Sequence, residues 1–187
     1  MATDYERFNA GERRLHWGTA LTVLFLGTTG LAIWAGYDKW ELAGVEALPW
    51  AHFWLGGGSL LGGVVGYLAW RSPPIVAAAK RLNFGQRVNL LVMQVLLGGM
   101  FASGLVIHFG RSWGMTKPVR SLIKQGHLTA AMGVGLVILA HLVMVFVVAK
   151  NRGIVRAMLT GRVDAEVARR SAPAWVAEIE ATERENP

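Results

Sequence analysis

The chain has 187 residues, of which 53% are hydrophobic and only 17% are charged, and its formal net charge is +7. A soluble domain of this length needs more charge on its surface, and since no Asp or Glu occurs between Glu46 and Asp164, the composition excludes an ordinary soluble protein. The chain has no cysteine, which excludes iron–sulfur clusters, c-type haem attachment and disulfides within it.

Four apolar segments are each long enough to cross a hydrocarbon core of about 30 Å as a helix, which takes about 20 residues. In chain order they cover residues 16–37, 51–70, 87–109 and 121–149. Their many glycines are typical of membrane helices, where small residues let backbones or a flat ligand approach closely. Strands of a barrel would be shorter and would alternate. The sequence therefore predicts an all-α, membrane-embedded four-helix bundle.

An even number of spans places both termini on one side of the membrane. Of the 19 Lys and Arg residues, 14 lie in the N-terminal segment, the second-to-third loop and the tail, and five lie in the other two loops. By the positive-inside rule, both termini are predicted to be cytoplasmic. We expect a transmembrane domain over residues 1–150 and a cytoplasmic or interfacial tail over residues 151–187.

A phrase at the entrance of the first span returns at the entrance of the third. "ERFNAGERRLHW" at 6–17 is matched by "KRLNFGQRVNLL" at 80–91, and "TTGLAIW" at 28–34 is matched by "ASGLVIH" at 102–108. We interpret this as a weak duplication of a helical hairpin. Asn followed three residues later by Glu or Gln also resembles a helix capping box, and arginines are common at the membrane interface.

All five histidines lie in or beside the spans, where ionisable groups are costly and indicate function. They are His16, His52, His108, His127 and His141. The last two lie 14 residues apart on the fourth span, so they project from one face about 21 Å apart along the axis. His16 starts the first span at the depth of His141, and His52 starts the second at the depth of His127. The depths therefore predict two stacked pairs, His16 with His141 and His52 with His127.

A pair of imidazoles between helices can occupy both axial positions of a haem iron, which suits electron transfer. A zinc site would need three or four clustered ligands, so two b-type haems fit better. Bare glycine surface on the second and fourth spans suits a porphyrin, although close helix packing explains single glycines equally well. His108 belongs to neither pair, and we prefer an interfacial role for it to that of a competing ligand. Ligation of a haem by one histidine and Met132 or Met144 is a less economical alternative.

The alternative without haem is a transporter or scaffold that uses its histidines for protons or packing.

The loop before the fourth span is basic, and its cations suit haem propionates, an acidic partner surface or plain solvation. These cations are Arg111, Lys117, Arg120 and Lys124.

The phrases "ERFNAGERRLHW", "RLNFGQR", "GHLTA" with "LAHL", and the tail "RGIVRAMLTGRVDAEVARRSAPAW" together resemble the cytochrome b, or gamma, subunit of membrane-bound formate dehydrogenases. The histidine spacing is shared with the wider superfamily of bacterial di-haem cytochromes b. The resemblance implies a bacterial inner-membrane subunit in which His16 and His141 hold the cytoplasmic haem, and His52 and His127 the periplasmic one.

The resemblance also implies a quinone pocket that uses Asn83, Gly85 and Gln86. Electrons would pass from an iron–sulfur (beta) subunit through the two haems to ubiquinone or menaquinone. Formate oxidation would belong to a molybdenum- or tungsten-containing (alpha) subunit, because this chain carries no site for it. We expect membrane lipid but no nucleic acid as a partner, and leave open a higher oligomer of the complex. The alternatives are a hydrogenase-type subunit and a stand-alone di-haem quinone oxidoreductase.

Overall fold

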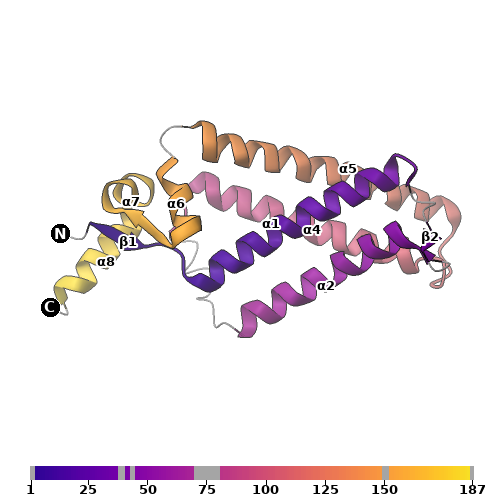
Figure 1. Cartoon of the computed structure of the whole chain (residues 1–187), viewed down its shortest axis with the longest axis horizontal. Coiled ribbons are helices and arrows are strands. Elements are labelled where there is room, and N and C mark those ends of the chain that lie inside the picture. Colours follow the sequence, from indigo (N-terminus) through magenta and orange to yellow (C-terminus); the bar gives the residue numbers. More distant parts are fainter. Residues whose placement is uncertain (1–2, 38–40, 43–44, 70–80, 149–151, 186–187) are drawn as a thin grey trace. The chain divides into compact units, whose positions relative to one another are not determined.

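The computed structural model describes residues 3–37, 41–42, 45–69, 81–148 and 152–185, and its backbone is mostly helical (Figure 1). The chain divides into two units. The first, here called the terminal unit, combines residues 1–14, 70–92 and 138–187. The second, here called the helical unit, combines residues 15–69 and 93–137.

Four long helices cover most of the predicted apolar segments, and the first ends at Trp34 and not at residue 37, because Gly36 has a φ of 91°. They are α1 (Ala10–Trp34), α2 (Ala47–Ala69), α4 (Phe84–Phe109) and α5 (Lys117–Leu142), and α5 continues into a π-helical turn, η2 (Val143–Val147). Among the described residues, α1, α4 and the α5–η2 segment are long and apolar enough to cross a membrane. The prediction of a helical membrane protein is thereby confirmed. The predicted ends at residues 70 and 149 lie outside the described residues.

The first and third spans begin earlier than predicted because each has a polar first turn that is capped. The Asn9 side chain accepts a hydrogen bond from the Glu12 amide at 2.9 Å, and the Glu12 carboxylate accepts one from the Asn9 amide at 2.8 Å. Asn83 and Gln86 make the same two bonds at 3.0 Å. These are two complete capping boxes. The capping interpretation of the repeated phrase is confirmed, and the helices start at residues 10 and 84.

The long helices keep many large apolar side chains on the outside. Leu21, Leu24 and Leu31 of α1 are 63–67% exposed. Burying such a side chain would stabilise a soluble protein by about 2 kcal/mol, so a water-soluble helix would not leave this many in water. Their exposure fits helices that face lipid.

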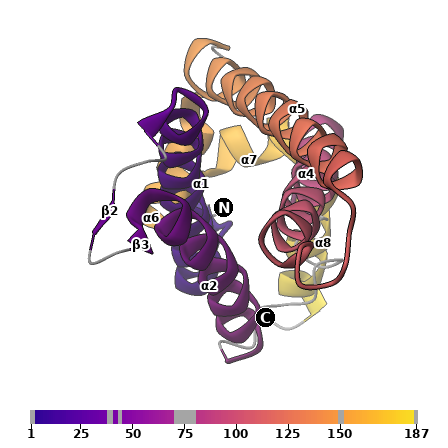
Figure 2. The ribbon, with the colours of Figure 1, turned by 90° about the vertical axis from the view of Figure 1, so that its right-hand side faces the viewer.

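Within the helical unit, α2 packs beside α1 and α5 packs beside α4 (Figure 2). A glycine lies at each contact, where an added Cβ atom would make an ordinary van der Waals contact. A Cβ atom at Gly56 would lie 3.7 Å from Leu26, and one at Gly133 would lie 3.8 Å from Leu96. The two helix pairs follow the two copies of the repeat, with α1 and α2 from the first and α4 and α5 from the second.

The terminal unit has its own small core. Strand β1 (Asp4–Glu6) pairs antiparallel with β4 (Arg162–Asp164), and the helices α6 (Arg152–Thr160), α7 (Ala165–Ser171) and α8 (Pro173–Glu185) complete it. The buried core residues are Tyr5, Phe8, Ala157, Val163, Ala165, Ala168, Ala172, Trp175 and Val176.

The predicted tail therefore does not stand alone over its described part, residues 152–185. It packs against residues 4–8 from the start of the chain. Gly161 has a φ of 89°, which favours glycine, and its carbonyl accepts the amides of Arg7 and Phe8. The predicted domain boundary at residue 150 lies outside the described residues. A second strand pair, β2 (Glu41–Leu42) with β3 (Val45–Glu46), precedes α2.

Candidate functional site

Two of the predicted iron ligands, His52 and His127, lie next to each other in the helical unit. His52 is near the start of α2 and His127 is in the first half of α5. Their ring centres are 6.4 Å apart and their planes are inclined by 70°. The structure thus brings together the pair that helix depth predicted.

The spacing of these rings suits a metal ion between them. Metal–imidazole nitrogen bonds of about 2 Å would place the two ring centres roughly 6 Å apart. The observed 6.4 Å agrees with this separation. In a haem the porphyrin supplies the four equatorial nitrogens, so two imidazoles complete the coordination and no acid or thiolate ligand is needed.

A hydroxyl group from the neighbouring helix stands at Nδ1 of each ring. The Thr29 oxygen, on α1, is 2.8 Å from His52 Nδ1. The Ser103 oxygen, on α4, is 2.7 Å from His127 Nδ1. Thr29 is only 7% exposed, on a helix whose other side chains are largely exposed. Both hydroxyls were missed in the sequence, although each precedes a glycine in the repeated segments 28–34 and 102–108.

The other predicted pair is divided between the two units. His16 lies near the start of α1 in the helical unit, where its ring centre is 5.2 Å from that of Trp17. His141 lies near the end of α5 in the terminal unit, two residues before the π-helical turn η2 begins at Val143. Such turns often mark functional positions. The pairing of His16 with His141 stays a prediction.

His108 occupies an aromatic cluster beside the first pair. Its ring is stacked on Phe53, with centres 3.7 Å apart and planes inclined by 8°. The Phe109 ring meets its edge at 4.6 Å, and Trp54 lies 6.4 Å away. The ring thus serves as an aromatic packing surface, and the interfacial role of His108 stays a prediction.

The three residues predicted to contact quinone lie at the start of α4, in the terminal unit. Asn83 and Gln86 form the second capping box, which uses their side-chain oxygens. The amide NH2 group of Gln86 is the donor that this cap does not use. A Cβ atom at Gly85 would lie 3.6 Å from the Asn83 side chain, which is ordinary contact.

The two capping boxes are joined by the arginines that precede them. Arg7 is fully buried and donates to the Arg81 carbonyl at 2.7 Å and to the Ser171 hydroxyl at 2.8 Å. Burial, together with the nearby charge of Arg81, lowers the pKa of Arg7 to about 10. Arg81 in turn pairs with the Glu12 carboxylate at 2.5 Å. Arg7, Arg81 and Glu12 therefore form a hydrogen-bonded joint between the two copies of the repeated phrase in the terminal unit.

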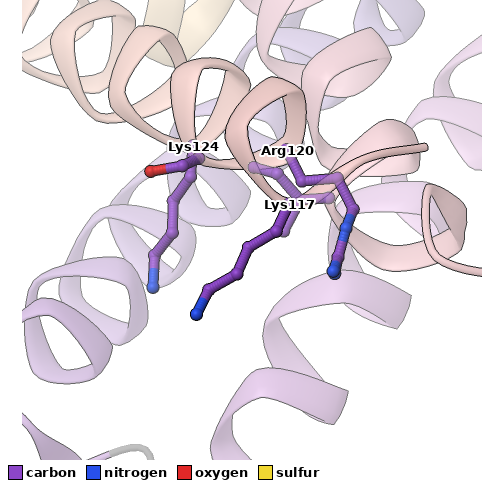
Figure 3. A pocket seen from close by; sticks show the side chains of 5 residues that line it. Lys117, Arg120 and Lys124 are labelled. Atoms are coloured by element: carbon purple, nitrogen blue, oxygen red, sulfur yellow. The ribbon is translucent and has the colours of Figure 1, made fainter.

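A basic pocket of about 280 Å³ lies at the start of α5. Lys117, Arg120 and Lys124 project into it from one side of the helix (Figure 3), and Ile107 and Ser121 complete its lining. The Nε atom of Arg120 is buried and has no hydrogen-bond partner among the described residues. Three cations with an unused donor suit a carboxylate ligand.

Comparison with protein families extends what the geometry indicates. Residues 7–161 match the family model described as prokaryotic cytochrome b561. This match covers all five histidines and both copies of the repeat. Comparison with curated proteins gives no match.

Proposed function

Because the chain belongs to the prokaryotic cytochrome b561 family, it is a membrane electron-transfer protein that binds haem b, and we propose that it is the di-haem, quinone-reducing subunit of a respiratory formate dehydrogenase. The observation that carries the proposal is the placement of His52 and His127, with ring centres 6.4 Å apart. His52 and His127 would hold a b haem there, and the haem would supply one-electron transfer with no coordination position left for oxygen.

The second haem is proposed on His16 and His141. One face of α5 carries His127 and His141, about 21 Å apart along the axis. One pair would then lie near each surface of the membrane. The two haems would form a path across it, with the outer haem held by His52 and His127.

The proposed membrane orientation is supported by the terminal unit. Pairing of β1 with β4 holds the first and last described segments of the chain together. This supports an even number of membrane spans, in which α2 joins the three helices α1, α4 and α5–η2, and it supports both termini on one side of the membrane. The distribution of Lys and Arg favours the cytoplasmic side of the bacterial inner membrane.

Quinone is proposed to bind beside the inner haem at Asn83, Gly85 and Gln86. A quinone carbonyl accepts hydrogen bonds, and the Gln86 NH2 group is a donor that the capping box leaves over. The basic pocket of Lys117, Arg120 and Lys124 is proposed to bind carboxylates, either of the outer haem or of an acidic partner.

Iron–sulfur and molybdenum- or tungsten-containing subunits are the proposed partners. The tail phrase at residues 152–175 supports the formate dehydrogenase assignment by its resemblance. The alternatives, a hydrogenase-type subunit and a stand-alone di-haem oxidoreductase, share the histidine pattern and differ in partners. Copurification with iron–sulfur and molybdenum- or tungsten-containing subunits supports the first assignment. Isolation as a coloured homodimer supports the stand-alone enzyme.

The test is the reduced-minus-oxidised spectrum of the purified protein, with haem quantified per chain. We expect two b haems in the wild type and one in His52→Ala or His127→Ala. His16→Ala and His141→Ala should each remove the other haem. If His52→Ala retains both haems, the proposed outer site is wrong, and if the wild type contains none, the haem-free alternative replaces it.

A further inference from the structure

We propose that Thr29 and Ser103, which occupy the same position in the two copies of the repeat, are positioning residues that hold His52 and His127 with Nε2 free for iron. The inference rests on the proposed outer haem and adds two groups to it that do not touch iron. The juxtaposition that carries it is one hydroxyl at Nδ1 of each ring, at 2.8 and 2.7 Å.

The hydrogen-bond partners of the two hydroxyls determine where the imidazole proton lies. The Thr29 oxygen is 2.9 Å from the Phe25 carbonyl of its own helix, which can accept its single proton. We assign that proton to the backbone bond, so that the Thr29 oxygen offers His52 a lone pair and the imidazole proton is on Nδ1. A neutral imidazole protonated at Nδ1 has its lone pair at Nε2, which is the form that binds a metal.

Ser103 repeats this arrangement on the other side of the pair. Its oxygen is 2.7 Å from the Gly99 carbonyl of α4 and 2.7 Å from Nδ1 of His127. The same reasoning places the proton of His127 on Nδ1. Both ligands are thus held in the same tautomer by an acceptor on the adjacent helix. Metal-bound histidines generally donate their second ring N–H to such an acceptor.

A glycine follows each hydroxyl residue and gives the ring room. A Cβ atom at Gly30 would lie 3.2 Å from Cε1 of His52, which is closer than ordinary contact. One at Gly104 would lie 3.8 Å from Cε1 of His127. The hydroxyl fixes the Nδ1 edge of the ring, and the glycine lets the ring lie against the helix.

The repeat explains why the arrangement occurs twice. Thr29 and Gly30 correspond to Ser103 and Gly104 at the offset of 74 residues that separates Arg7 from Arg81. Their histidine partners, His52 and His127, follow in the next helix of each copy. Each copy of the hairpin therefore supplies one axial ligand together with the hydroxyl and glycine that position it.

The test compares Thr29→Val with Thr28→Val. Thr28 donates to the same Phe25 carbonyl at 2.9 Å, but its side chain is exposed and makes no other hydrogen bond to the described residues. The readouts are haem per chain, the EPR spectrum of the oxidised outer haem and its midpoint potential. An acceptor at Nδ1 makes the imidazole a stronger donor to iron and favours the oxidised state.

We expect Thr29→Val to raise the midpoint potential of one haem, to change its EPR spectrum and to weaken haem retention by about 10-fold. Thr29→Ser should restore the wild-type values, and Thr28→Val should not change them. Ser103→Ala, rescued by Ser103→Thr, should act on the same haem. The rescue variants keep the test valid if Thr29→Val folds poorly.

Two results separate this inference from the proposed function. If His52→Ala loses a haem but Thr29→Val and Ser103→Ala match Thr28→Val in potential and EPR spectrum, the positioning role is overturned and the haem site stands. If His52→Ala keeps both haems, the site itself is wrong and the inference falls with it.

Discussion

Arg7 and Arg81 each donate a hydrogen bond to the backbone carbonyl of the other, at 2.7 and 2.5 Å. They occupy the same position in the two copies of the repeated phrase, 74 residues apart. The exchange is therefore reciprocal, as in a symmetric dimer, although both residues belong to one chain. It joins the capped start of α1 to the capped start of α4 within the terminal unit.

Replacing Arg81 with Met should destabilise this joint. The Glu12 carboxylate, whose side chain is 14% exposed, would lose its charged partner, and the Arg7 carbonyl would lose its donor. Leaving such groups unsatisfied costs about 2–3 kcal/mol. The free energy of unfolding, from denaturant titration in detergent, checks this. The control is Arg156→Met, since the Arg156–Asp164 pair is 53% and 49% exposed and should cost below about 1 kcal/mol. If Arg81→Met and Arg156→Met lowered the free energy of unfolding equally, the joint would have no special role in stability.

The two copies of the repeat also provide a test of the quinone site. Gln86→Glu places at the second cap the residue that Glu12 already provides at the first, so the capping box is kept. The change replaces the NH2 donor proposed to bind quinone with a negatively charged carboxylate oxygen, which can only accept hydrogen bonds. We expect quinone reduction to fall about 10-fold or more, with haem content unchanged.

Gln86→Ala is the companion variant, because it removes the cap and the donor together. It should lower turnover as Gln86→Glu does and should also lower thermal stability by about 1 kcal/mol. If Gln86→Glu turns over quinone at the wild-type rate, the quinone site does not use this amide.

Several features of the site could be predicted because they depend on one helix at a time. The depth of His52 and His127 follows from residue counting along apolar segments, and the capping boxes follow from a spacing of three residues. These signals are local and periodic. They predicted that His52 lies next to His127, and the capping boxes mark the starts of α1 and α4, which the apolar segments alone placed at residues 16 and 87.

Other features could not be predicted because they depend on which helix faces which. Thr29 and Ser103 reach histidines 23 and 24 residues away through the packing of neighbouring helices. The pairing of β1 with β4 joins residues from opposite ends of the chain, such as Tyr5 and Val163. A strand of three residues has too little pattern to be recognised in a sequence.

His108 should be dispensable for haem binding. Its ring stacks on Phe53 at 3.7 Å, a contact that a phenylalanine can also make. We therefore expect His108→Phe to retain two b haems per chain and an unchanged reduced-minus-oxidised spectrum. His108→Ala removes the stacking partner and is expected to lower thermal stability. Loss of one haem in His108→Phe would make His108 a ligand.

Neutralising Arg120 should lower the midpoint potential of the outer haem. The Arg120 Nε atom has no hydrogen-bond partner among the described residues. If this guanidinium meets a haem carboxylate, its charge favours the reduced state, because reduction adds an electron nearby. Redox titration of Arg120→Gln checks this, with Lys117→Gln expected to shift the potential less. An unchanged potential with weaker, salt-dependent binding of the iron–sulfur partner would assign the pocket to the partner instead.

The last prediction concerns the acid stability of the terminal unit. Tyr5 donates to the Glu180 carboxylate at 2.8 Å and Arg169 donates to it at 3.0 Å, and these bonds lower the pKa of Glu180 from its ordinary value of 4.5. Because the folded state has the lower pKa, the stabilisation is complete above pH 4.5 and is lost as the pH falls through the folded pKa.

Glu180→Gln should therefore be less stable than the wild type at pH 6, and the difference should shrink as the pH falls below the ordinary value of 4.5. Thermal unfolding at pH 6, 5, 4 and 3 (about one-unit steps) measures this. The control is Glu183→Gln, on the same helix, whose carboxylate accepts no hydrogen bond among the described residues; its melting temperature at pH 6 should be close to that of the wild type. If the difference in melting temperature between Glu180→Gln and the wild type does not change with pH, the carboxylate stabilises α8 by packing and not by its charge.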